Sequence, residues 1–368
     1  MKNLTFLLYI LAKSVSNIRP PLVEALQNWP AIIPNLDLGK IDPKEFCSSI
    51  NLNPEQTRKF IINFTTESQE SYFSLLEEHG IQTTNIFALS YPTQLLQIPD
   101  PPLVLYYRGS NIKLLESTSL AIVGSRRASS YGKIVVNKII SEISGTNLTI
   151  ISGLAYGIDA ISHQAAMMNN LSTIAVLGGG LDDASIYPKN NYSLAKEILQ
   201  NGGLIVSEYP PLSPALKHQF IARNRIIAGL SQGTIVVEAA TSSGALLTAD
   251  FAMDYNRSVY SIPGQIFSLQ SQGTNNLIKQ GAQMLTSVED LLLDFDISPQ
   301  TTAATKNRQF SSHQLAVLKC MQSGQPMDVE EIIEKSRLST AEVLSTISEL
   351  TLRNIITQIS VQTYQKIK

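Results

Sequence analysis

Residues that could bind an anion occur directly after short apolar segments of this sequence. "LAIVG" (120–124) leads into "SRRASS", "LTIISG" (148–153) leads into "LAYGID", and "GTIVVEAA" (233–240) leads into "TSSGALLTA". Glycine-rich turns that open a helix bind phosphate groups, because the first backbone N–H groups of a helix have no partner within it. Arg126 adds a cation to the first of these turns. The pattern therefore indicates a phosphate-binding site.

A second basic segment, "KHQFIARNR" (217–225), adds an aromatic residue. On a helix Lys217 and Phe220 share one face, so that a cation stands beside a ring that can stack on a base. Arg223 and Arg225 are two apart and cannot face the same way, so one is expected to reach the ligand and the other to brace the loop. Lys189, in "YPKNN", adds a further cation to the same rim. The candidate binding residues are Gly124, Ser125, Arg126, Gly153, Lys189, Lys217, Phe220, Arg223, Asn224, Arg225, Ser243 and Gly244.

The sequence offers less support for cofactor binding or catalysis than for phosphate binding. A dinucleotide fingerprint requires glycine where Arg126 stands and an acidic residue at the end of the second strand, which here ends in Ser152 and Gly153. A Walker A motif is also absent from the sequence. Asp159 and His163 are four apart and could form an acid–base pair, but a helix cap and a packed histidine are favoured because no nucleophile is evident.

The remaining candidate for catalysis is Glu238, which could be a catalytic acid or a brace for the arginines. Histidines without cysteine partners disfavour a metal site. We therefore expect a binding protein rather than an enzyme, with no cofactor and no metal. Several cations and an aromatic ring around anion-binding turns favour a phosphate polymer over a small substrate.

The elements that would position these residues begin near Leu120. From there to about Leu293, apolar strands alternate with helices, which predicts an α/β domain with a parallel sheet covered on both faces. The carboxyl ends of parallel strands share one edge of the sheet, and ligands bind at that edge. Residues 86–295 are expected to form this domain.

The two ends of the chain have different patterns. Residues 1–85 predict short helices, one of them over 21–27, and no convincing strand. Residues 296–309 form a polar linker, and residues 310–368 predict three helices followed by a two-stranded wing, as in a winged helix. Its third helix, over 340–354, has Arg353 as its only cation, which favours a protein-contact or structural role over duplex recognition.

Composition limits the class of protein. The 368 residues are enough for two or three domains, and 43% of them are hydrophobic. The net charge of −2 excludes a uniformly basic nucleic-acid binder, so a polyanion site must gather its cations locally. Cys47 and Cys320 fall in different expected domains, which disfavours a disulfide and fits a reducing cytoplasm. The apolar start, "LTFLLYILA", is expected to be a buried helix, and no other segment is long enough to span a membrane.

Seven segments between Tyr91 and Leu293 resemble, in order, the blocks of the DNA-processing protein A (DprA/Smf) family. They are "AIVGSRRASSYG", "ISGLAYGIDAISHQAA", "AVLGGGLDDASIYPKNN", "LIVSEYPP", "KHQFIARNRIIAGLS", "TIVVEAATSSGALLTA" and "SIPGQIFSLQSQGTNNLIKQGA". The resemblance implies an extended Rossmann-like fold with an N-terminal helical (SAM-like) domain and a C-terminal winged helix. It also implies a homodimer that binds and protects single-stranded DNA and loads the RecA recombinase onto it during natural transformation. By position, it makes Arg126 and Lys217 phosphate-binding residues and Phe220 a base-contacting residue, with Lys189 a weaker match.

The sequence departs from the family pattern at several positions. Tyr156 stands where members usually carry a basic or small residue, so stacking is expected to replace one phosphate contact. The wing lacks its usual glycines. An alternative function remains, because "SQGTIVVE" (231–238) is similar to the phosphate-binding loop of nucleoside-monophosphate phosphoribohydrolases, although the leading glycine pair of that loop is missing.

Overall fold

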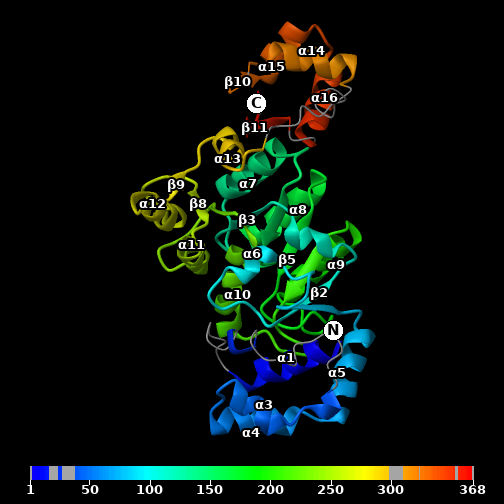
Figure 1. The fold of residues 1–368 in the computed structure, drawn as a ribbon. Helices are drawn as coiled ribbons and strands as arrows, with labels where there is room; N and C mark the ends of the chain where they lie inside the picture. Colours follow the sequence, from blue (N-terminus) through cyan, green and yellow to red (C-terminus); the bar gives the residue numbers. More distant parts are fainter. Residues whose placement is uncertain are drawn as a thin grey trace. The chain divides into compact units, whose positions relative to one another are not determined.

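The computed structural model describes residues 2–15, 24–26, 38–297, 310–322, 324–352 and 355–366. The chain divides into two compact units, Met1–Gln300 and Thr301–Lys368. Most of the expected linker, residues 298–309, and Arg353 lie outside the described residues, as does the expected helix over 21–27 except for residues 24–26. The first unit contains the α/β sheet and the N-terminal helices, and the second is a small domain with its own core (Figure 1).

Short capped helices form the N-terminal region. Asn53 and Gln56 make a reciprocal capping box at one helix start, and Asp42 accepts a hydrogen bond from the Lys44 N–H (2.8 Å) at another. The helices are α1 (Lys2–Ser14), α3 (Pro43–Ser49), α4 (Pro54–Asn63) and α5 (Thr66–Glu78), with a 3₁₀ turn η1 (Leu38–Lys40). The expectation that residues 1–85 contain no strand is wrong, because Gln82–Asn85 forms strand β1. This strand is polar, so its pairing with β2, rather than an apolar pattern, defines it.

A nine-stranded, mostly parallel sheet forms the centre of the first unit. Its strand order is β1-β2-β6-β5-β4-β3-β7-β8-β9, with β1 and β2 antiparallel at one end. The strands from β3 to β7 are short and fully buried, as expected for a sheet covered on both faces. Strand bounds are β2 (Val104–Arg108), β3 (Ser119–Val123), β4 (Thr149–Ser152), β5 (Thr173–Val176), β6 (Leu204–Ser207), β7 (Gly233–Val236), β8 (Ser258–Ser261) and β9 (Gln283–Met284).

Helices cover both faces of this sheet (Figure 1). Alternate residues of β3 point to opposite faces: Leu120 and Ile122 join the core made with α7, α8 and α13, and Ala121 and Val123 join the core made with α10 and α11. The helices are α6 (Thr93–Leu96), α7 (Ser130–Glu142), α8 (Ile158–Met168), α9 (Tyr192–Gln200), α10 (Lys217–Leu230), α11 (Gly244–Asp254), α12 (Gln272–Lys279) and α13 (Val288–Asp294). The 3₁₀ turns are η2 (Ile112–Glu116), η3 (Lys189–Asn191) and η4 (Leu269–Ser271).

The second unit has a winged-helix fold. Helices α14 (Ser312–Cys320), α15 (Val329–Ser336) and α16 (Thr340–Leu352) pack around a core that includes Val317, Ile332 and Val343. Strands β10 (Pro326–Asp328), β12 (Thr363–Lys366) and β11 (Ile356–Ser360) form an antiparallel sheet in that order. The predicted fold class, an α/β sheet with an N-terminal helical region and a C-terminal winged helix, is confirmed.

Across the described ranges, no helix combines the length and apolar character needed to cross a membrane.

Candidate functional site

The order of strands places two of the predicted loops at a switch point of the sheet. In the sheet, β4, β5 and β6 lie on one side of β3, while β7 and β8 lie on the other side. The loops that follow β3 and β7 therefore diverge at the carboxyl edge of the sheet, the place where ligands bind in open α/β folds. The two loops are joined here, because the Ser125 N–H donates to the Glu238 carbonyl oxygen (2.7 Å).

The side chain of Glu238 braces this switch point. It is 2% exposed, and its carboxylate accepts hydrogen bonds from the Ser129 N–H (2.9 Å) and the Ser129 hydroxyl. Ser129 is the N-cap of α7. Of the two interpretations that the sequence left open for Glu238, the geometry supports the brace, although the partner is a helix cap and not an arginine.

Arg126 lies on an exposed turn beside Phe220. Its guanidinium carbon is 6.0 Å from the centre of the Phe220 ring, within the range of a cation–π contact. Phe220 is partly buried in the first turn of α10, which begins at the exposed Lys217. The fold thus brings together a cation and a ring that are far apart in the sequence.

Tyr187, which was not among the predicted site residues, belongs to the same group. Its ring centre is 5.4 Å from that of Phe220 at an angle of 46°, and the residue is 49% exposed. We call Arg126, Tyr187 and Phe220 the aromatic cluster. The sequence held one signal for Tyr187, namely an aromatic residue two positions before the predicted Lys189.

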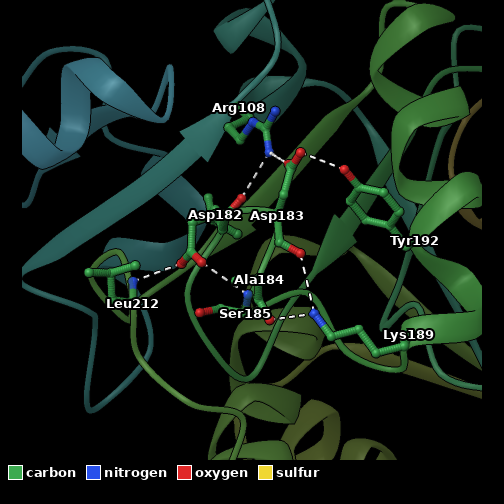
Figure 2. A network of polar contacts seen from close by, with 9 residues as sticks. Arg108, Asp182, Asp183, Ala184, Ser185, Lys189, Tyr192 and Leu212 are labelled. Carbon is green, nitrogen blue, oxygen red and sulfur yellow. Dashed lines mark hydrogen bonds and ion pairs between the residues drawn. The ribbon is translucent and has the colours of Figure 1, made fainter.

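Lys189 is turned back onto its own loop. Its ammonium group donates to the carbonyl oxygens of Ala184 and Asp183, the latter at 3.3 Å (Figure 2). The Asp183 carboxylate accepts from Arg108 (2.7 Å) and from the Tyr192 hydroxyl. Together these donors hold the pKa of the Asp183 carboxyl below its usual range.

Asp182 fixes the same loop from inside. It is fully buried and accepts from the N–H groups of Leu212 (2.7 Å) and Ser185 (3.0 Å), as Figure 2 shows. Burial disfavours the charge of Asp182, yet these donors outweigh it and hold the pKa of the carboxyl below its usual range. The loop between β5 and α9 is therefore anchored at several points.

Arg223 and Arg225 both act as internal braces in the structure. Arg223 is 4% exposed and donates to the carbonyl oxygens of Gly153 (2.6 Å) and Val176, and burial lowers its pKa to about 10. The side chain of Arg225 is 11% exposed and pairs with Asp100 (3.0 Å) and Glu208. The expectation was that one of the two reaches the ligand, whereas in the structure both guanidinium groups are buried and bonded to acceptors of the protein itself.

The remaining predicted residues make hydrogen bonds or close contacts near the carboxyl edge of the sheet. Asn224 donates to the Gly244 carbonyl oxygen (3.1 Å), which links α10 to the start of α11. Ser243 caps α11 through the Ala245 N–H (3.3 Å). Gly153 packs so closely that a Cβ there would lie 2.6 Å from the Arg223 guanidinium. The Gly153 N–H donates to the buried Asp159 (3.1 Å).

His163 is a packed residue, as the sequence favoured. It is fully buried, and its Nδ1 lies 2.7 Å from the Thr173 hydroxyl. Burial lowers its pKa to about 3, so the imidazole is neutral at physiological pH. Within the ranges that the structure describes, no group of three or more His, Cys, Asp or Glu could hold a metal ion.

Comparison with known proteins identifies the family of this chain. Residues 82–296 match the family model described as DNA recombination-mediator protein A. Protein Smf of Escherichia coli is 36% identical over 308 residues, which are 82% of this chain and 81% of that protein. DNA processing protein DprA of Streptococcus pneumoniae is 42% identical over 233 residues, which are 62% of this chain and 81% of that protein.

Two solved structures are also similar. The crystal structure of DprA from Streptococcus pneumoniae has a TM-score of 0.68 and 35% identity, covering 79% of this chain and 97% of that one. A DprA structure from Helicobacter pylori, described by its single-stranded DNA binding mode, has a TM-score of 0.53 and 32% identity, covering 59% of this chain and 98% of that one. The family match over most of the α/β unit and the identity over four fifths of Smf lead to one conclusion: this chain belongs to the DNA-processing protein A (DprA/Smf) family.

Proposed function

We propose that this protein binds single-stranded DNA at the carboxyl edge of its sheet, with little sequence preference. The observation that carries the proposal is the contact of Arg126 with Phe220 at the switch point. A guanidinium beside an accessible ring offers both a phosphate partner and a stacking surface, and these are the two contacts that single-strand binders combine. Bases in a duplex are already stacked on each other, so a duplex should bind less well.

The binding mechanism is passive. Arg126 and Lys217 neutralise neighbouring phosphates, and those N–H groups of the Gly124 and Ser243–Gly244 turns that are not bonded within the protein donate further hydrogen bonds. Phe220 stacks on one base. Arg223 and Asn224 contribute by holding the loops in place, and Arg225 fixes α10 to Asp100 and Glu208.

We also propose that the bound strand is protected and passed to the RecA recombinase during natural transformation, in the cytoplasm. The family description, a recombination mediator, supports this role and names no catalytic activity. For the alternative, a nucleoside-monophosphate phosphoribohydrolase, Glu238 would have to act on a substrate. Its carboxylate is instead buried against Ser129.

A salt titration of oligo-dT binding tests the proposal, with fluorescence anisotropy as the measurement. Binding of a single strand should fall with salt at a log–log slope of about 0.7 per phosphate contacted, so Arg126→Ala/Lys217→Ala should lower the slope by about 1.4. The control, Lys59→Ala/Lys138→Ala, removes two exposed lysines that pair with Glu55 and Glu142 away from the site. A double mutant that binds like the control would place the DNA elsewhere. If the wild type binds neither single strand nor duplex, the alternative function as a phosphoribohydrolase would be favoured.

The homodimer is a further part of the proposed function. Ile266, Phe267 and Leu269, in the segment between β8 and α12, are 76%, 92% and 69% exposed. Clustered exposed apolar side chains mark interaction surfaces. A dimer would bring two DNA-binding sites to one DNA strand, and together they would bind it more tightly than either site alone. We expect Phe267→Ser to halve the mass measured by light scattering while the far-ultraviolet circular dichroism stays unchanged. An unchanged mass would exclude this surface.

A further inference from the structure

The loop between β5 and α9 adds an aromatic residue to the proposed binding site. Tyr187 and Phe220 come from different elements, and their ring centres are 5.4 Å apart. This distance places the rings in direct contact, so no base fits between them. Each ring must therefore offer its surface to a base from outside the pair. Arg126 contacts the Phe220 ring as well, so the three side chains form one continuous patch.

Several hydrogen bonds anchor the loop between β5 and α9 to the rest of the domain. Arg108, which ends β2, donates to the Asp183 carboxylate (2.7 Å) and to the Leu181 carbonyl oxygen (3.0 Å), and Asp182 is held by two backbone N–H groups (Figure 2). Charge-assisted hydrogen bonds of this kind are stronger than neutral ones. A half-exposed tyrosine on an anchored loop loses little further conformational freedom when it contacts a ligand.

Lys189 has a different role from the one that its charge suggests. Its ammonium donates to the carbonyl oxygens of Ala184 and Asp183, which lie five and six residues before Lys189, the first residue of η3. These bonds close the loop segment that carries Tyr187. A lysine whose donors are directed at its own backbone is less available to a phosphate than the exposed Arg126 or Lys217.

We propose that Tyr187 is a second base-stacking residue, beside Phe220, and that Lys189 positions it by closing the loop. This inference rests on the proposed single-strand binding at the same site. Two adjacent rings would give stacking contacts to two nucleotides of a bound strand, while Arg126 and Lys217 contact the phosphates.

Substitution of Tyr187 separates stacking from charge. Stacking on one base changes affinity about 5- to 150-fold, so Tyr187→Ala should weaken oligo-dT binding within this range while the salt slope stays that of the wild type. Tyr187→Phe keeps the ring and should bind like the wild type. Met168→Ala is the control, since Met168 is 73% exposed at the end of α8 that leads into β5, on the opposite edge of the sheet. Equal binding by wild type and Tyr187→Ala would overturn the stacking role of Tyr187 but not the proposed function.

Lys189→Ala tests the positioning role. If Lys189 closes the loop, the variant weakens binding with an unchanged salt slope, and Tyr187→Ala/Lys189→Ala binds no more weakly than Tyr187→Ala. A direct phosphate contact would instead lower the slope by about 0.7 and make the two effects additive, which would overturn the positioning role.

Tyr187→Trp provides a readout that does not depend on affinity. The sequence has one other tryptophan, Trp29, so the wild type serves as the background. Oligo-dT should quench the additional emission, and Arg126→Ala/Lys217→Ala should shift this quenching to higher oligo-dT concentration. Emission that stays constant while anisotropy reports binding would show that no base contacts this position. If the wild type binds no oligo-dT at all, the proposed function itself fails.

Discussion

Two glycines beside the proposed binding site differ in the space that surrounds them. Gly157 has a φ of +73°, and a Cβ there would lie 2.2 Å from the Ser125 carbonyl oxygen. The loop after β4 can pack on the loop after β3 only because this position has no side chain. Around Gly244, which begins α11, no atom lies within 4 Å of an added Cβ. The fold therefore requires glycine at position 157 but not at position 244.

Alanine at the two positions should give opposite results. Gly157→Ala should lower the free energy of unfolding by more than about 1 kcal/mol, because of backbone strain and a steric clash. Gly244→Ala should leave it unchanged or raise it by up to about 1 kcal/mol, and should weaken oligo-dT binding because the methyl group keeps phosphate from the helix N-terminus. Urea unfolding and anisotropy measure the two effects. Unweakened binding by Gly244→Ala would remove the Ser243–Gly244 turn from the proposed site.

Part of the site could be predicted from the sequence because its residues lie in local motifs. Arg126 lies in the loop between β3 and α7, and Lys217 and Phe220 share one turn of α10. Tyr187 could not be predicted in this way, since its contact with Phe220 depends on which strands are neighbours. The role of Arg225 could not be predicted either, because its partner Asp100 lies in the segment before β2, outside any motif.

Helix α8 makes the stability of the fold sensitive to acid. Its His163 is buried with a pKa of about 3, against an ordinary value of 6.5. Between these values the unfolded chain binds a proton that the folded chain excludes. The contribution of His163 to stability is therefore complete above pH 6.5 and declines toward pH 3, by up to about 1.4 kcal/mol per pH unit.

His163→Asn should remove this dependence. The amide can donate to Thr173 as the imidazole does, so the variant should fold, with some loss of stability at pH 7 from the lost ring volume. Between pH 6.5 and 5, its free energy of urea unfolding should fall less steeply than that of the wild type. Parallel slopes in the two proteins would mean that His163 takes up its proton without unfolding.

The elements themselves were predictable to different degrees. Continuous apolar runs such as "LAIVG" are typical of buried parallel strands, and the structure has β3 there. The segment "QTTN" has no such pattern, yet it forms β1, because Val104–Arg108 offers it an antiparallel partner. Tertiary pairing overrides local propensity at this edge of the sheet.

On the scale of the whole molecule, the second unit should be dispensable for single-strand binding. Helix α16 includes Glu342 and Glu349 but no lysine or arginine, and the unit has a hydrophobic core of its own. A chain ending at Gln300 should bind oligo-dT within a factor of about two of the full chain, a difference of about 0.4 kcal/mol. A larger loss in anisotropy at equal salt would assign DNA contacts to residues 301–368.

The N-terminal region covers the antiparallel end of the sheet, so a chain shortened there would expose strand β2. The Tyr72 hydroxyl donates to the Tyr106 hydroxyl of β2 (3.1 Å), and Asn85 of β1 donates to Thr5 of α1 (3.0 Å). A cut at the expected boundary after residue 85 would strip β1 and these helices from β2 and leave it as an open edge. Such edges recruit strands from other molecules. We therefore expect a fragment that lacks the N-terminal region to self-associate more readily than the whole chain.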